Sequence, residues 1–267
     1  MSTVPSNRPL DLSVQMPLAM PWRRQLNAYL QEARSECLRY LRQPSFLLPV
    51  MLFPTAFYLM FGVVMGARNG VDAPRFLLAA YGTFGVMAPG LFGFGVSLAL
   101  ERDGGLLTLK RALPMPPAAY LLGKMAMAVL AAGGVLALLQ LLATFLAHVS
   151  LSGQQIVALQ LTGMLGVLPF CALGFLVGTL IKGQGAPGMI NLIYLPMSFL
   201  SGLWFPLSIM PPALRALAPV WPSTHLNALM MSALGFDVGP RWPHVLVLLA
   251  MTVGFLGLAV RRLRRLG

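Results

Sequence analysis

Few residues in this sequence have the types and spacing that a catalytic site needs, and their pattern argues against a reaction catalysed by this chain. A P-loop needs a glycine five residues before a Gly-Lys pair, so that the lysine reaches the phosphates of ATP. Only Lys124 of the three lysines follows a glycine, and Ala118 stands where the first glycine belongs. The sequence lacks a His-Glu-x-x-His motif, and Cys37 and Cys171 are too few for a thiolate zinc site. We predict no catalytic residue, no metal site and no cofactor bound by this chain.

His225 and one charged segment are the remaining candidates. His225 follows Ser223 and Thr224, but no acidic residue lies nearer than Asp237, which favours a capping or helix-contact role over catalysis. Residues 101–124 combine two carboxylates with four cations. Two glycines allow a chain break, leucines give an apolar face, and prolines end the helix. Such a helix is suited to docking into a groove of another protein, and a solvated loop is the alternative.

The elements that must position these residues are apolar helices. The chain has 267 residues, 57% of them hydrophobic and 10% charged, whereas soluble domains are about a quarter charged. About 20 apolar helical residues cross a bilayer. We therefore expect an all-α membrane protein with a transmembrane domain over 46–260, whose six spans cover about 46–67, 76–100, 125–147, 156–181, 188–206 and 243–260. Prolines between the last two spans argue against a seventh span and favour short external re-entrant helices over 207–236.

The basic residues predict the orientation. With six spans, 15 of the 19 Lys and Arg residues lie on one side together with both termini, which identifies that side as cytoplasmic. The excess of Lys and Arg on the cytoplasmic side then explains the net charge of +12, so nucleic-acid binding is not needed to explain it. Residues 101–124 become a cytoplasmic loop, and 261–267 become a basic cytoplasmic tail.

The N-terminal region divides into two parts. Residues 1–21 have no apolar signal-peptide core and are predicted to be a disordered tail. Residues 22–45 follow a 3.6-residue period, with a charged face that includes Glu36, Arg39 and Arg42. We expect a helix lying on the membrane surface and in contact with lipid. It either anchors the first span or also contacts a cytoplasmic partner.

The predicted spans contain no Asp, Glu, Lys or Arg. Carriers driven by ion gradients usually have titratable groups near the midplane of the membrane. Without a P-loop either, active transport by this chain would need a partner that hydrolyses ATP. A passive channel or a structural membrane subunit is the alternative, and an intramembrane enzyme is less favoured.

Two motifs resemble a known family. Residues 101–107 read Glu-Arg-Asp-Gly-Gly-Leu-Leu and 113–116 read Leu-Pro-Met-Pro, which is similar to the E-R-x-x-G-T-L…L-x-x-x-P signature of ABC-2 type exporter permeases. Residues 200–207, with Pro211 and the Pro-x-Thr-His run ending at His225, resemble the segment after span five of that family. Gly105-Leu106 replaces the usual Gly-Thr, and the first 20 residues match nothing in the family.

The resemblance implies a six-span half-transporter in the bacterial inner membrane. It would pair with a second copy or a similar permease and export an amphipathic, lipid-linked or drug-like molecule. Separate ABC ATPase subunits would bind the ATP and magnesium. The resemblance assigns ATPase coupling to Glu101, Arg102, Asp103, Gly104, Gly105, Leu106, Leu109, Arg39 and Arg42. It suggests a path lined by spans one, two and five, with candidates Asn191, Tyr194, Met197, Phe57 and Phe92, and a re-entrant segment containing Ser201, Gly202, Phe205, Pro206 and His225. For Asn191, a helix-to-helix hydrogen bond within one subunit is the alternative.

Overall fold

The computed structural model describes residues 21–66, 70, 72–112 and 116–265, and every regular element within these ranges is helical. The predicted all-α fold is confirmed. All but the last residue of the expected disordered tail lies outside the described residues, as do Leu113 and Pro114 of the loop motif.

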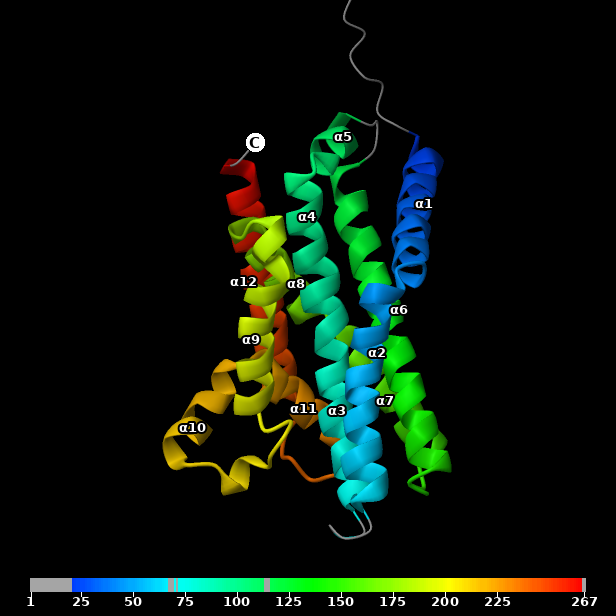
Figure 1. Cartoon of the computed structure of the whole chain (residues 1–267), viewed down its shortest axis with the longest axis vertical. Helices are drawn as coiled ribbons and strands as arrows, with labels where there is room; N and C mark the ends of the chain where they lie inside the picture. The colour runs from blue at the N-terminus through cyan, green and yellow to red at the C-terminus, as the bar shows by residue number, and fades with distance from the viewer. Residues whose placement is uncertain (1–20, 67–69, 71, 113–115, 266–267) are drawn as a thin grey trace, which may run out of the picture.

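The long helices stand side by side as a bundle (Figure 1). Five continuous helical stretches are long and apolar enough to cross a membrane. They are α2 with η1 (Pro44–Phe57, Tyr58–Val64), α3 with η3 and α4 (Ala73–Gly90, Leu91–Val96, Ser97–Asp103), α6 (Pro117–Phe145), α7 with α8 (Gly153–Gly166, Leu168–Leu180), and α12 (Trp242–Arg265). A reciprocal capping box between Ser152 and Gln155 begins α7.

The span expected at 188–206 is shorter than predicted. After η4 (Gly183–Gly185), helix α9 covers Ala186–Leu200, which is 15 residues. That length gives about 22 Å, less than the roughly 30 Å of a hydrocarbon core. Gly202 has a φ of +77° and its N–H bonds to the carbonyl of Phe199, so the chain turns away before Phe205 and Pro206. The described residues therefore hold five helices of spanning length, and a sixth is not confirmed.

The centre of the bundle is the long helix formed by α3, η3 and α4. Residues Leu78–Gly90 of α3 are all buried. Helix α8 packs closely against η3, because a Cβ at Gly178 would lie 2.7 Å from the carbonyl oxygen of Gly95. Glycine at this position therefore lets two backbones touch.

Short helices follow α9, in the region where the sequence predicts them. They are η5 (Leu207–Ile209), α10 (Pro212–Leu217), η6 (Ala218–Val220) and α11 (Pro222–Ala233). They lie at the lower end of the bundle in Figure 1, and α11 packs against α3, α7 and α12.

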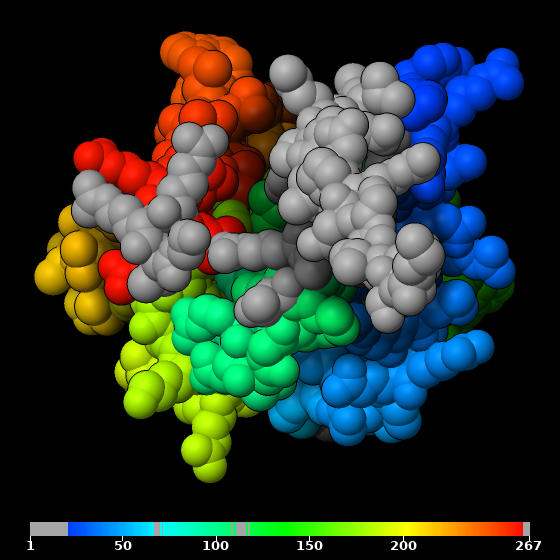
Figure 2. Space-filling view, turned by 90° about the horizontal axis from the view of Figure 1, so that it is seen from above, coloured from blue at the N-terminus to red at the C-terminus, as the bar shows by residue number. Residues whose placement is uncertain are grey.

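Helix α1 (Trp22–Leu41) stands beside the upper part of α6 and does not lie across the end of the bundle (Figure 1). The predicted helix lying on a membrane surface is therefore not confirmed. Part of its charged face is buried, since Glu36 is only 3% exposed. The helix ends at Leu41, and α2 begins at Pro44, so the expected boundary near residue 45 falls a few residues late. Viewed from the upper end, α9, α4 and α2 line one edge of the molecule (Figure 2).

Candidate functional site

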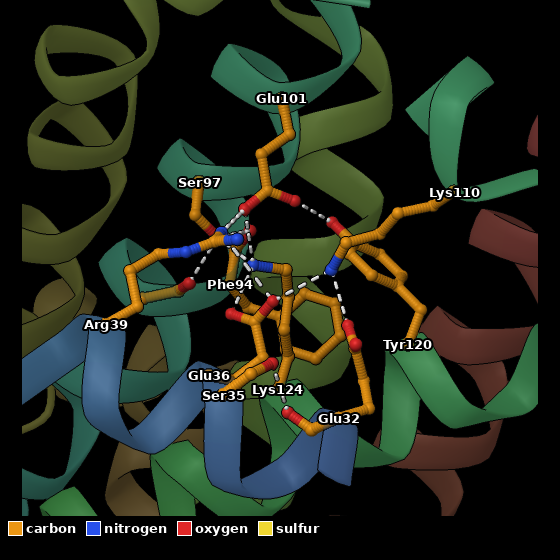
Figure 3. Close-up of polar contacts among 11 residues, drawn as sticks. Glu32, Ser35, Glu36, Arg39, Phe94, Ser97, Glu101, Lys110, Tyr120 and Lys124 are labelled. Atoms are coloured by element: carbon orange, nitrogen blue, oxygen red, sulfur yellow. Dashed lines mark hydrogen bonds and ion pairs between the residues drawn. The ribbon is translucent and has the colours of Figure 1, made fainter. Parts of the chain in front are cut away.

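Four helices meet at a cluster of charged side chains near the upper end of the bundle (Figure 3). Helix α1 supplies the carboxylates of Glu32 and Glu36 and the guanidinium of Arg39. Helices α4, α5 (Leu106–Ala112) and α6 supply the rest. We call this set the ion cluster; it consists of Glu32, Glu36, Arg39, Ser97, Glu101, Lys110, Tyr120 and Lys124. Its three carboxylates and three cations make it formally neutral.

Lys124 is the centre of the ion cluster and is fully buried. Its Nζ donates to Glu36 Oε2 at 3.1 Å, to Ser97 Oγ at 2.9 Å and to Glu101 Oε1 at 2.9 Å. An ammonium group has three protons, so all of its donors have partners. A buried charge is costly unless it is paired and hydrogen-bonded, and Lys124 satisfies both conditions.

Lys110 joins α5 to α1 through Glu32 and through Glu36, whose Oε1 lies 3.1 Å from its Nζ. Burial would raise the pKa of Glu36, but Lys124, Lys110 and Arg39 together outweigh it and hold the pKa below the ordinary 4.5. Burial would lower the pKa of Lys110, but Glu32 and Glu36 outweigh it and raise the pKa above 10.5. Both groups are therefore charged at neutral pH.

Glu101, predicted from the resemblance to couple to a partner, points inward. It is 9% exposed and accepts hydrogen bonds from Arg39, from Lys124 and, at 2.7 Å, from Tyr120 Oη. Arg39 and Glu101, both predicted to couple to the ATPase, thus contact each other within the ion cluster.

Arg102 and Asp103 hold the end of α8. The Arg102 guanidinium donates to the carbonyls of Gly178, Thr179 and Ile181 at 3.2, 3.1 and 2.6 Å. Asp103 Oδ2 accepts the Gly183 N–H at 2.6 Å. The Arg102 bonds satisfy carbonyls that a helix C-terminus leaves without intrahelical partners. Together with the Asp103 bond, they also fix the position of the predicted loop relative to α8 and η4.

The other predicted coupling residues face outward or form the turn. Gly104 and Gly105 connect α4 to α5, and Gly105 has a φ of +74°, which favours glycine. Leu106 is half-buried, whereas Leu109 is 61% exposed and Arg42 is exposed at the end of α1.

Sequence reasoning predicted only Arg39 and Glu101 of the eight residues of the ion cluster. It placed Lys124 at the end of the cytoplasmic loop and Glu36 on the charged face of the surface helix. The spacing offered a signal, because Glu32 with Glu36 and Tyr120 with Lys124 are each i,i+4 pairs on one helix face. Gly123 was a second signal. A Cβ there would lie 2.9 Å from Glu32 Cγ, so glycine brings α1 close to α6.

An apolar cavity of about 510 Å³ lies between α2, the α3–η3 helix and α9. Its lining is rich in aromatic rings and includes four of the predicted path residues, Phe57, Phe92, Asn191 and Tyr194. Tyr194 Oη donates to the carbonyl of Phe84 at 2.9 Å, which ties α9 to α3. Asn191 is exposed, and its side chain makes no hydrogen bond within the described part of the chain. The fifth predicted residue, Met197, is fully buried and lies outside the lining.

The residues predicted for the re-entrant segment join α9 to the short helices. Ser201 Oγ contacts Ser223 Oγ at the start of α11, while Phe205 and Pro206 are exposed. His225 Nε2 donates to the carbonyl of Pro219 at 2.9 Å, so its Nδ1 accepts from His244 Nδ1, also at 2.9 Å. His225 therefore makes a helix contact. Within the described ranges, no group of three His, Cys, Asp or Glu side chains could hold a metal ion.

Comparison with known proteins points to one family. The family described as ABC-2 type transporter matches residues 28–235. The chain is similar to "Putative transport permease YvfS" of Bacillus subtilis strain 168, with 27% identity over 239 residues, 86% of this chain and 95% of the relative. It is also similar to "Inner membrane transport permease YhhJ" of Escherichia coli K12, with 27% identity over 180 residues. That match covers 64% of this chain and 46% of the relative.

Proposed function

The chain belongs to the ABC-2 type transporter family, and on that premise we propose that this membrane permease is the transmembrane subunit of an ATP-driven exporter. Partner ABC ATPases bind ATP and magnesium at the end of the bundle that carries α1 and α5. The permease works as a pair, in the bacterial inner membrane, with both termini in the cytoplasm. Its substrate is amphipathic, lipid-linked or drug-like and leaves the cytoplasm or the inner leaflet.

The ion cluster is the observation that carries this proposal. Of the two segments proposed to contact the ATPase, α1 is bonded by charged side chains to the spans of α4 and α6, and α5 is bonded to α1 through Lys110. A displacement of α1 or α5 therefore cannot leave α4 and α6 in place without separating buried charges, which is costly.

The ion cluster also lies next to the apolar cavity. Ser97, which accepts from Lys124, directly follows Val96, and Val96 lines the cavity. Phe92 lies one turn earlier in the same continuous helix. Motion of α4 would thus reach the lining of the cavity through a single helix.

The surroundings of the cavity support pairing of two permeases. Helix α2 exposes Leu48, Leu52 and Phe53 beside the cavity. A second permease covering this face would close the cavity into a path between two subunits. The short helices from η5 to α11 then re-enter the outer leaflet below it.

The exposed side chain of Leu109 offers a test of ATPase docking. Leu109→Glu places a charge on the outer face of α5 without touching the ion cluster. We expect this variant to insert normally but to lose the P-loop ATPase that co-purifies with the wild-type permease from native membranes. Arg261→Glu is the control, because Arg261 is exposed near the C-terminus, outside α1 and α5. Wild-type recovery of the ATPase with the Leu109 variant, or nucleotide-independent transport by the purified permease, would contradict the proposal.

A further inference from the structure

A second apolar groove lies away from the ion cluster and the aromatic cavity. Its volume is about 460 Å³, within the roughly 300–1,000 Å³ typical of small-molecule sites. Residues of α7 and α12 line it together with residues of α8 and α11. The lining side chains are mostly Leu, Val and Ala, with Thr162, Thr252 and Arg241 as the polar exceptions.

Arg241 lies where the groove reaches the start of α12. Its Nε donates to Ser232 Oγ, and Nη2 donates to the Ser232 carbonyl at 3.3 Å. No carboxylate within the described ranges forms an ion pair with it, and its Nη1 makes no hydrogen bond there. Two contacts with one serine therefore fix the guanidinium beside an apolar groove while its charge stays unneutralised.

The flanking surface is suited to lipid. Leu161 and Leu165 on α7 and Leu249 on α12 are each more than half exposed. Trp242, next to Arg241, is 66% exposed, and tryptophan in membrane proteins concentrates at headgroup depth. The groove thus offers an apolar channel for an acyl chain, with a cation at the level of the headgroups.

We propose that this groove binds one anionic phospholipid, with its phosphate on Arg241 and an acyl chain between α7 and α12. The planar fork of a guanidinium matches the oxygens of a phosphate group. Because acyl chains gain little by exchanging lipid for an apolar groove, the headgroup contact supplies the selectivity. The site rests on the chain being embedded in a membrane and not on coupling to an ATPase.

The charges at this end of the bundle argue against a second copy as the occupant. The described residues there carry Arg75, Arg215 and Arg241 with only Asp72 and Asp237. Another copy would bring mainly cations to Arg241, whereas an anionic lipid brings the missing negative charge.

The experiment is native mass spectrometry of the full chain in detergent, titrated with phosphatidylglycerol or phosphatidylcholine. We expect the wild type to retain one phosphatidylglycerol in preference to phosphatidylcholine. Arg241→Gln should weaken phosphatidylglycerol binding by about tenfold, as expected for a lost charge-assisted hydrogen bond. Arg215→Gln is the matched control, since Arg215 contacts only carbonyls and lies outside the groove.

A second pair of variants tests the acyl-chain part of the groove. Thr162→Phe fills the groove from α7, and Val157→Phe adds the same ring to an exposed position of α7 outside the lining. We expect the first to abolish the retained lipid and the second to leave it. Equal binding of the two lipids, or unchanged binding in both Arg241→Gln and Thr162→Phe, would overturn the proposal. A shift from dimer to monomer in these variants, without loss of lipid, would instead identify the groove as a contact between copies.

Discussion

At the scale of single residues, the main feature is a buried lysine in a segment that the sequence predicts to be a cytoplasmic loop. Lys124 has three acceptors, and two of them are carboxylates from different helices. A buried pair adds little net stability compared with apolar side chains, but removing one partner leaves the others as uncompensated buried charges. The ion cluster therefore specifies how the four helices fit together.

Lys124→Met should therefore destabilise the protein strongly. Glu36 and Glu101 lose the fully buried cation that lies between them, and we expect the free energy of unfolding to fall by about 3–5 kcal/mol. Denaturant unfolding in detergent measures the change. Lys182→Met is the control, because Lys182 is exposed, and it should change the stability by less than about 0.5 kcal/mol. Similar stabilities for the two variants would show that the ion cluster does not hold the helices together.

The ion cluster also predicts how stability depends on pH. The folded pKa of Glu36 lies below 4.5, so its contribution is present above pH 4.5 and is lost as the pH falls through the lower folded value. The folded pKa of Lys110 lies above 10.5, so its contribution is present below pH 10.5 and is lost as the pH rises through the higher folded value. Thermal unfolding across pH should show a plateau between these limits. Glu36→Gln should flatten the acid side, and an equally steep acid loss would contradict this assignment.

At the scale of helices, glycine decides which elements touch. Gly123 lets α1 approach α6, and Gly178 lets α8 approach η3. Gly202 ends α9 before it reaches the length of a span. At each of these positions a glycine sets a helix contact or a helix end. The apolar pattern of the sequence predicts the helices but not these contacts and ends.

Gly123→Leu should separate α1 from α6, because the added side chain meets the backbone of α1. Cys37 on α1 provides a natural probe. Burial, helped by Glu36, raises the pKa of its thiol and slows labelling, while Cys171, the other cysteine, is fully buried. We expect faster maleimide labelling of Cys37 in the variant. The control is Gly188→Leu, because a Cβ at Gly188 meets open space; no difference between the variants would show that α1 does not depend on this contact.

At the scale of the whole molecule, the ion cluster and the aromatic cavity are joined by one continuous helix. The segment Ala73–Asp103 carries Glu101 at its upper end and lines the cavity with Phe84, Ala88, Phe92 and Val96. A rigid element of this kind links a contact at one end to the shape of a cavity further along.

A bulky residue in the cavity should therefore block transport without releasing the ATPase. Asn191→Trp fills the cavity from α9, and a cost of about 1–3 kcal/mol corresponds to roughly 5- to 150-fold weaker substrate binding. Transport into vesicles and co-purification of the ATPase are measured together. Leu192→Trp is the control, because Leu192 is 67% exposed and lies outside the lining. Equal transport by the two variants would remove the cavity from the path.

The sequence by itself determined which segments form helices and that the long helices are suited to a membrane. Apolar length predicts five of the helices of spanning length, prolines predict the short helices after α9, and Gly104 with Gly105 predicts the break before α5. These signals are local, because each depends on residues within one or two helical turns.

Only the tertiary structure decided which charges are buried and what they contact. Lys124 meets Glu101 from 23 residues away and Glu36 from 88 residues away. The sequence places Glu36 on a charged helix face and Glu101 and Lys124 in a cytoplasmic loop, and it gives no sign of their burial because burial depends on which helices pack together. Pairing across four helices reverses that interpretation, since the free energy of a charge is set by its neighbours in space.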